Sequence, residues 1–256
     1  MRAPTERFSD RVADYVKYRP SYPQGVIDLI VATAGITDEA SIADVGCGTG
    51  IFAKLLLETG AYVLGVEPNQ AMLEAALIGL GGNPKFKSFN RTAEDTGIES
   101  RSIDAITAAQ AFHWFKQEEA RHEFRRILKP GSPTFLVWNE RASRGSAFSQ
   151  LYEQALKDCS PEYAKVGHRN TPDEDILAWF QDPSARVEQF QNAQHLDLES
   201  FLGRVYSSSY TPADGTPERE AITERLIAIF EQCQHEGTIT LDYVTKVFVG
   251  RLSPSA

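Results

Sequence analysis

The sequence contains little cysteine, no long apolar run and fewer basic than acidic residues. Its three cysteines, Cys47, Cys159 and Cys233, lie far apart without a C-x-x-C pair, which argues against a disulfide framework and against a bound metal. No apolar run approaches the roughly 20 residues of a membrane span, and the charged start "MRAPTERFSDR" lacks the apolar segment of a secretory signal. We therefore expect a soluble, cytoplasmic protein that contacts no membrane.

Basic residues are outnumbered, because 26 residues are Lys or Arg and 35 are Asp or Glu, which gives a formal net charge of −9. A general nucleic-acid binder needs a net basic face, so this balance predicts no nucleic-acid partner. Hydrophobic residues make up 42% of the 256 residues, which is enough for a packed core. At this length one domain with an elaboration is expected rather than two independent domains.

Short apolar segments alternate with helical patterns over the first 140 residues. Strands are predicted at 41–46, 62–67, 85–89, 102–110 and 133–140, and helices at 26–35, 50–60, 69–80 and 116–131. Such alternation builds right-handed crossovers and a parallel sheet that binds ligands beyond the carboxyl ends of its strands. The fold class we expect is α/β: a Rossmann-like three-layer sandwich with a mostly parallel seven-stranded sheet and a helical cap.

The alternation changes after Glu140. Helical patterns follow at 146–158, 173–182, 198–210 and 217–232, and strand patterns at 186–197 and 238–252. The charged run "RHEFRR" in the helix before this change is expected to lie on a solvated helix face.

The clearest motif is "ADVGCGTG", residues 43–50, between a predicted strand and a predicted helix. Gly46, Gly48 and Gly50 remove side chains where the backbone must approach a ligand, and they allow positive φ. The first amides of the following helix can bind a polar or negative group. Glu67 ends the next predicted strand, where a carboxylate can accept hydrogen bonds from a ribose diol.

Three features in and around the glycine loop narrow the choice of nucleotide. Ile51 stands where the dinucleotide fingerprint G-x-G-x-x-G needs a third small residue, which disfavours a dehydrogenase. The P-loop pattern is absent, because no Lys followed by Ser or Thr comes after the loop. Asp44, inside the strand end, adds negative charge that suits an ammonium or sulfonium group better than a pyrophosphate.

The segments "DVGCGTG", "VEPN", "AEDTGI" and "IDAITAAQAFHWF" resemble the successive motifs of class I S-adenosylmethionine-dependent methyltransferases. More narrowly, they are similar to the small-molecule branch that includes trans-aconitate-type methyltransferases, whose core follows a segment like "ADYVKYRPSYP" here. The resemblance implies an enzyme that transfers a methyl group from S-adenosylmethionine to a small-molecule acceptor, a carboxylate or a hydroxyl, and releases S-adenosylhomocysteine. We expect a monomer or a homodimer.

The resemblance also implies a division of the chain and a set of site residues. The division is a single domain (1–256) with a lid segment (1–25), a cofactor-binding core (26–140), a helical insertion that caps the substrate (141–182) and C-terminal strands and helices that complete the sheet (183–256). The cofactor residues it implies are Tyr18, Arg19, Asp44, Gly46, Cys47, Gly48, Gly50, Glu67, Pro68, Met72, Ala93, Glu94, Asp95, Gln110, Ala111 and His113.

Particular roles follow from the family's pattern. Asp44 would lie near the amino group of the methionine part, and Glu67 would hold the ribose hydroxyls. Asp95 would accept a hydrogen bond from the exocyclic amine of the adenine, and Arg19 would reach the carboxylate of the cofactor. His113 is the candidate catalytic base, because its reference pKa lies near neutrality.

Several of these roles compete with a structural one. "AEDTGIES" could be a polar loop with a helix cap, which would leave Asp95 outside the site. His113 could pack beside the cofactor without transferring a proton, and Cys47 fits a small packing residue. Aromatic residues that could line the lid and the acceptor pocket, or fill ordinary cores, are Tyr15, Tyr18, Tyr22, Trp179, Phe180, Tyr206 and Tyr210.

Two alternative functions stay open beside the small-molecule enzyme. One is a non-catalytic nucleotide-binding module, against which the intact Gly46, Gly48, Gly50 and Glu67 count. The other is methylation of a macromolecule, tRNA or protein. The net charge of −9 disfavours tRNA, and the asparagine motif of many nitrogen methyltransferases is absent, since the fourth strand ends in "QAFHWF".

Overall fold

The computed structural model describes residues 12–142, 146–160, 163, 171–208 and 210–252. Its centre is a seven-stranded sheet with the order β3-β2-β1-β4-β5-β7-β6. The strands are β1 (Ser41–Val45), β2 (Tyr62–Val66), β3 (Phe86–Phe89), β4 (Ala105–Ala109), β5 (Pro133–Arg141), β6 (Arg186–Leu196) and β7 (Ile239–Arg251). The first five pair in parallel, and β7 runs antiparallel to both β5 and β6. The predicted mostly parallel seven-stranded sheet is confirmed.

Helices follow the strands in the order that the sequence pattern predicts. They are α1 (Val12–Tyr18), α2 (Gln24–Ala34), α3 (Ile51–Leu57), α4 (Gln70–Leu80), α5 (Gln117–Ile127), α6 (Ala147–Cys159), α7 (Asp173–Trp179), α8 (Leu198–Tyr206) and α9 (Pro217–Cys233), with a 3-10 turn at Phe112–Trp114. Asn69 caps α4 as predicted, because its side chain accepts a hydrogen bond from the Met72 amide. None of the described helices is both long enough and apolar enough to cross a bilayer.

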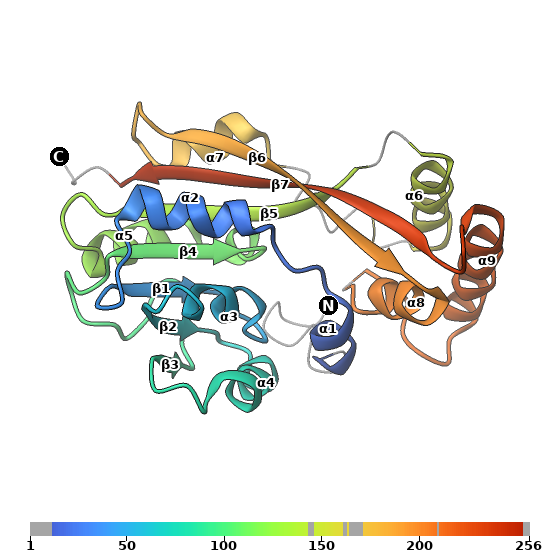
Figure 1. The fold of residues 1–256 in the computed structure, drawn as a ribbon, viewed down its shortest axis with the longest axis horizontal. Helices are drawn as coiled ribbons and strands as arrows, with labels where there is room; N and C mark the ends of the chain where they lie inside the picture. The colour runs from blue at the N-terminus through green and yellow to red at the C-terminus, as the bar shows by residue number, and fades with distance from the viewer. Residues whose placement is uncertain (1–11, 143–145, 161–162, 164–170, 209, 253–256) are drawn as a thin grey trace.

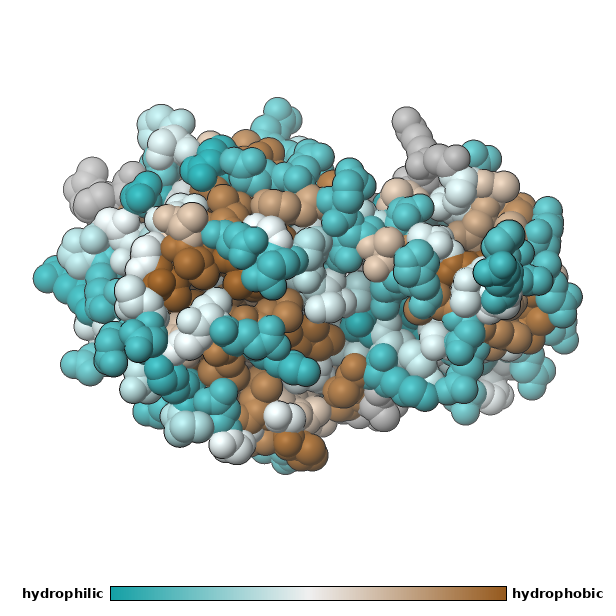
Figure 2. Space-filling view, viewed as in Figure 1, coloured by the Kyte–Doolittle hydropathy of each residue, from teal (hydrophilic) through white to brown (hydrophobic). Residues whose placement is uncertain are grey.

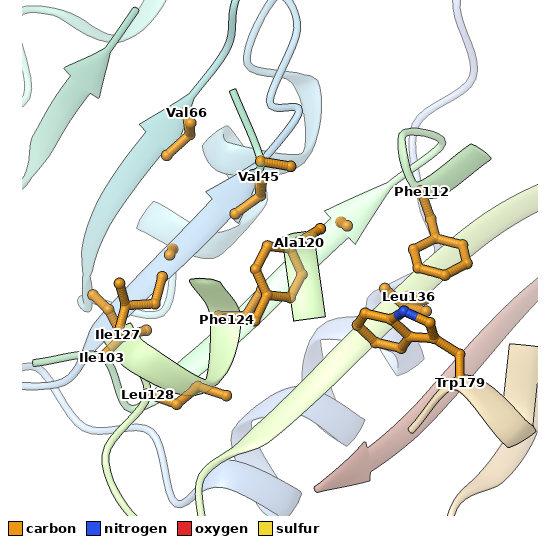
Figure 3. Packing of buried hydrophobic residues seen from close by; sticks show 14 of the residues in the cluster. Val45, Val66, Ile103, Phe112, Ala120, Phe124, Ile127, Leu128, Leu136 and Trp179 are labelled. Carbon is orange, nitrogen blue, oxygen red and sulfur yellow. The ribbon is translucent and has the colours of Figure 1, made fainter. Parts of the chain in front are cut away.

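Apolar side chains cover both faces of the sheet. Along β1 they alternate, so that Ile42 packs in the cluster beneath α2 and α3, while Ala43 and Val45 pack in the cluster beneath α5 and α7. Figure 3 shows this second cluster, where the rings of Phe112 and Trp179 meet edge to face with centroids 4.8 Å apart. Helices on both faces of one sheet confirm the predicted three-layer sandwich.

A third apolar cluster stands at one end of the sheet (Figure 1). It joins α6, α8 and α9 to the ends of β6 and β7 through residues such as Phe201, Leu226 and Tyr243. We call this unit the cap. Figure 2 shows hydrophilic side chains over both the sheet part and the cap on the face seen there. The helices divide differently from the predicted segments, because α7 packs on the sheet through Ile176 and Trp179, while α8 and α9 join α6.

The expectation that "RHEFRR" forms a solvated face is wrong for two of its charged residues. Arg121 and Glu123 are each only 8% exposed. Arg121 lies under α7 and donates from Nη1 to the Trp179 carbonyl oxygen at 3.1 Å. Glu123 accepts from the Thr96 amide at 2.8 Å, so it anchors the loop after β3. Both charges are buried because neighbouring segments supply the hydrogen bonds that water would otherwise make.

Candidate active site

A cavity with two adjoining lobes lies along the carboxyl ends of the parallel strands, the edge at which such sheets bind ligands. The lobes have volumes of about 230 and 170 Å³. They share Tyr15, Gly46, Gly48, Ala109 and Gln110, which we call the junction.

The two lobes are lined by different parts of the chain. The smaller one, the β2 lobe, is otherwise lined by Glu67, Pro68, Asn69, Met72, Thr92, Ala93, Glu94, Ala111, Trp114 and Phe115. The larger one, the cap lobe, is otherwise lined by Arg19, Pro20, Tyr22, Asp44, Cys47, Thr49, Ile51, Phe52, Asn139, Arg141, Glu153, Tyr163, Arg204 and Tyr210. Among the described residues no group of His, Cys, Asp and Glu is arranged to hold a metal ion.

The loop glycines serve different purposes, and Gly46, at φ 73°, leaves room for Ala111, whose Cβ atom would collide with an added Cβ. Gly48, at φ 55°, faces the junction, and an added Cβ would meet only the Met72 Cε atom at 3.5 Å. Gly50, at φ 84°, lines neither lobe, and a Cβ there would lie 2.7 Å from the Leu80 side chain. Gly48 therefore leaves room for a ligand, whereas Gly50 leaves room for α4.

Glu67, directly after β2, fixes the glycine loop from the neighbouring strand. Its Oε2 atom accepts from the Gly48 amide at 3.0 Å and its Oε1 atom from the Asn69 amide at 2.8 Å. Burial raises the pKa of this carboxyl, and the two amides oppose that effect. An ionised carboxylate accepts about four hydrogen bonds, so two lone pairs are left for a ligand in the β2 lobe.

Asp44, on β1, is fully buried at the floor of the cap lobe. Its Oδ1 atom accepts from the Thr107 hydroxyl at 2.8 Å, while Oδ2 has no hydrogen-bond partner among the described residues. Burial raises the pKa of Asp44 to about 7, and the nearby Glu67 adds to the shift. A cation placed beside Oδ2 would stabilise the ionised form.

Gln110 holds an uncommon backbone conformation at the junction. Its φ is 57°, in the left-handed region that non-glycine residues rarely occupy. Its side-chain Nε2 donates to the carbonyl oxygen of Asn139 on β5 at 3.2 Å. The strained turn directs the chain out of β4 where both lobes meet, and such strain is typical of functional sites.

Three buried guanidinium groups line the cap lobe. Arg141 donates to Glu153 at 3.3 Å and to the Tyr163 hydroxyl at 2.5 Å. Arg19 donates from Nη2 to the Ser207 carbonyl oxygen at 2.9 Å, and its buried Nε has no partner among the described residues. The third guanidinium is Arg204 on α8, only 5% exposed.

Four residues of the predicted site lie outside both lobes: Tyr18, Gly50, Asp95 and His113. Tyr18 packs on α8 and donates to Glu199 at 2.9 Å. Asp95 is exposed and pairs with Arg91 at 3.4 Å, as expected of a polar loop. Burial lowers the pKa of His113 to about 4, so its ring is neutral near pH 7.

Five polar residues of the cap lobe were not predicted from the sequence. Asn139, Arg141, Glu153, Tyr163 and Arg204 come from β5, α6, α8 and the segment after α6, and no motif links them. One feature of the sequence could have indicated Arg204, because this residue interrupts the apolar face of α8 that Phe201 and Val205 form.

Comparisons with known proteins agree with this geometry. Residues 43–136 match the family model of the methyltransferase domain. The chain is 30% identical over 243 residues to the uncharacterized methyltransferase Rv3342 of Mycobacterium tuberculosis, covering 93% of this chain and 92% of that protein. It is 31% identical over 130 residues to the "Probable S-adenosylmethionine-dependent methyltransferase CRG1" of Saccharomyces cerevisiae, covering 49% and 44%. A solved structure from Anaeromyxobacter dehalogenans has a TM-score of 0.67 at 23% identity, covering 93% and 100%.

Proposed function

The chain belongs to the class I S-adenosylmethionine-dependent methyltransferases, and we propose that the β2 lobe, the junction and the adjoining part of the cap lobe at Asp44 and Arg19 hold its cofactor. The rest of the cap lobe would receive a small-molecule acceptor. The observation that carries this assignment is the pair of acidic side chains on neighbouring strands. Glu67 keeps free lone pairs in the β2 lobe, and Asp44 keeps an unpartnered Oδ2 in the cap lobe. Gly48 leaves the space between them clear.

The residues present fit the two ends of the cofactor. Glu67 would accept hydrogen bonds from both ribose hydroxyls while its backbone bonds hold it in place. Asp44 Oδ2 would accept from the amino group, which supplies the missing partner of a buried acceptor. Arg19, with its unpartnered Nε, would donate to the carboxylate of the methionine part.

The adenine would lie in the β2 lobe between apolar side chains. Pro68, Met72 and Ala93 line this lobe, as the family resemblance implies, together with Phe115. Asp95 is left out of this assignment because its carboxylate pairs with Arg91 outside the lobe. The acidic side chain that lines the lobe there is Glu94, whose Oε1 accepts from the Lys116 amide at 2.8 Å.

When bound, S-adenosylmethionine supplies a methyl group on a sulfonium leaving group, which is already activated. The remaining work of the chain is to align the nucleophile and to exclude water. Gln110 is fixed at the junction by its bond to Asn139, and Tyr15 lines both lobes there. His113 is not assigned a proton transfer, because it lines neither lobe and burial lowers its pKa to about 4.

The acceptor we propose is a small molecule that carries a carboxylate or a hydroxyl group, as in the trans-aconitate-type branch. A lobe of about 230 Å³ between the sheet and α6 and α8 suits such a molecule better than a tRNA or protein chain. Its arginines favour an acidic compound, although the chain as a whole is acidic.

The experiment that tests this function begins with calorimetric titrations of S-adenosylhomocysteine, S-adenosylmethionine and NAD. Micromolar binding of the first two and no binding of NAD is expected. Transfer of labelled methyl groups is then measured on small carboxylic acids and alcohols, with bulk tRNA and protein as parallel substrates. Label in tRNA or protein with none in any small molecule would overturn the proposed acceptor class, and absent cofactor binding would overturn the proposed site.

A further inference from the structure

We infer that Arg204 is the anion anchor of the cap lobe: it binds a carboxylate of the acceptor that is separate from the group receiving the methyl. This inference rests on the proposed function, because it places the cofactor in the β2 lobe, the junction and the part of the cap lobe at Asp44 and Arg19. It adds to that function a requirement on the acceptor. The acceptor must carry a fixed negative charge at one end and its nucleophile at the other.

The charge of Arg204 is not balanced by any described carboxylate. Its Nε donates to the Tyr243 hydroxyl at 3.1 Å and its Nη1 to the Ser208 hydroxyl at 3.1 Å. Both partners are neutral groups, Nη2 has no partner, and no carboxylate among the described residues pairs with this guanidinium. A guanidinium keeps its proton in proteins, so Arg204 stays charged in a site that is 5% exposed. A buried charge of this kind calls for a counterion.

The two other arginines that line the cap lobe have a carboxylate partner or a proposed ligand. Arg141 pairs with Glu153 and Tyr163 across the lobe. Arg19 is assigned to the carboxylate of the cofactor. Of the three described arginines in the lobe, Arg204 is the one that has neither a carboxylate partner nor a proposed ligand.

Tyr210, an aromatic residue that lines the lobe with these arginines, lies in their positive electrostatic field. Burial alone would raise the pKa of its hydroxyl, but Arg141 and Arg204, with a hydrogen bond to Ser208 and a smaller effect of Arg19, lower it below the ordinary tyrosine value. Among the described residues, three arginines and two carboxylates, Asp44 and Glu153, line this lobe, and burial raises the pKa of Asp44 to about 7. The lobe is therefore positive near neutral pH within a chain of net charge −9.

The carboxylate that Arg204 binds differs from the group that receives the methyl. A carboxylate that accepts paired hydrogen bonds from a guanidinium has its lone pairs engaged, which makes it a weak nucleophile. Methylating it would also leave Arg204 buried without a counterion. Arg204 stands on α8 in the cap and is not a junction residue. The acceptor therefore extends from Arg204 to the junction, where its nucleophile meets the methyl group.

The test uses the full chain saturated with S-adenosylhomocysteine, which keeps probes out of the cofactor site. The probes are the dicarboxylates from malonate to adipate, their monomethyl esters and their neutral diamides, titrated by calorimetry. The proteins are the wild type, Arg204→Met, Arg204→Lys and the control Arg225→Met, which removes an exposed arginine of α9 that pairs with Asp158. The affinity for S-adenosylhomocysteine is measured for each protein first.

We expect at least one diacid and its monoester to bind the wild type and Arg225→Met equally, and the diamide to bind neither. The same diacid should bind Arg204→Met about tenfold or more weakly, and Arg204→Lys at an intermediate level. A diamide that binds as well as its diacid would overturn the inference. So would equal diacid affinity of Arg204→Met and wild type, or no diacid binding to the saturated wild type.

Two controls keep the outcome interpretable. If Arg204→Met fails to bind S-adenosylhomocysteine, the comparison of diacid with diamide on the wild type and the Arg204→Lys titration decide the question. If the wild type itself fails to bind S-adenosylhomocysteine, the proposed function has failed, and this result is distinct from a saturated protein that ignores every anion.

Discussion

The two lobes of the cavity differ in how their polar groups are held. In the β2 lobe the chain's own backbone positions the acidic side chain, since Glu67 is bonded to two amides within a few residues of strand ends. In the cap lobe long side chains from separate elements hold one another, as Arg141 does with Glu153 and Tyr163. The first arrangement keeps one ligand geometry fixed, whereas the second can change by substitution of single side chains without disturbing the strands.

The largest expected effect comes from breaking the backbone-held lobe. Glu67→Ala removes the acceptor of two amides and both proposed ribose bonds, so we expect S-adenosylhomocysteine binding to weaken by about 2 to 3 kcal/mol. Calorimetry measures the loss, and Glu74→Ala on the exposed side of α4 is the matched control. Unchanged affinity in a folded Glu67→Ala protein would remove Glu67 from the site.

The next effect tests the side-chain-held lobe. Glu153→Gln removes the carboxylate that pairs with the buried Arg141, so the free energy of unfolding should fall by about 2 kcal/mol. Because Glu153 is not among the residues proposed to hold the cofactor, affinity for S-adenosylhomocysteine should stay unchanged. Denaturant unfolding and calorimetry give the two values, with the surface variant Glu188→Gln for comparison. A parallel loss of cofactor affinity would show that the lobes are not independent.

The pH dependence of S-adenosylhomocysteine binding tests the role of Asp44 at the floor of the cap lobe. The pKa of Asp44 is raised to about 7 in the free protein, and a bound ammonium group would lower it. Binding then favours the ionised form, so affinity for S-adenosylhomocysteine should rise as pH increases through about 7, by at most about tenfold per pH unit.

Asp44→Asn supplies the control for this titration, because it removes the titrating group. Its affinity should be weaker and independent of pH over the same range. Asp28→Asn, an exposed change on α2, should keep the wild-type profile. A flat profile for the wild type would contradict the amino-group role of Asp44.

The smallest effects are expected outside the lobes. Asp95→Ala and His113→Ala should each leave cofactor affinity within about twofold of the wild type, because neither side chain lines the cavity. Turnover of His113→Ala should keep the wild-type pH profile, since the pKa of His113 lies at about 4. Loss of turnover at unchanged affinity would make His113 a catalytic residue after all.

The sequence predicted those parts of the molecule whose geometry is local. The strand, the glycine loop and the acidic residue after the next strand each occupy a short stretch, and the pairing of β1 with β2 brings Asp44 and Glu67 to one edge. Gly50 shows where this reasoning ends, because its positive φ is local but the contact with Leu80 depends on how α4 packs. Asp95 likewise depends on the direction of a loop, which Arg91 and the bridge between Thr92 and Asp95 decide.

Most of the cap lobe could not be predicted, because the residues that β5 and the cap contribute meet only through tertiary packing. Arg141 and Arg204 lie 63 residues apart and come together because β5, β6 and β7 pair side by side. The same cause explains the buried Arg121, which needed the later helix α7 to cover it. The periodicity of a helix or strand shows which side of the element is apolar. It does not show which distant element will bury a polar residue that stands on that side.

The place of β7 in the sheet has a consequence for synthesis on the ribosome. β7 lies between β5 and β6, although it follows both in the chain. The parallel strands β1 to β5 can therefore assemble while β7 is still inside the exit tunnel. β6 and the cap must wait for β7, because a strand cannot pair with a neighbour that has not yet emerged. A nascent chain would thus complete its glycine loop before its arginine lobe, and cofactor present during translation would stabilise the half that emerges first.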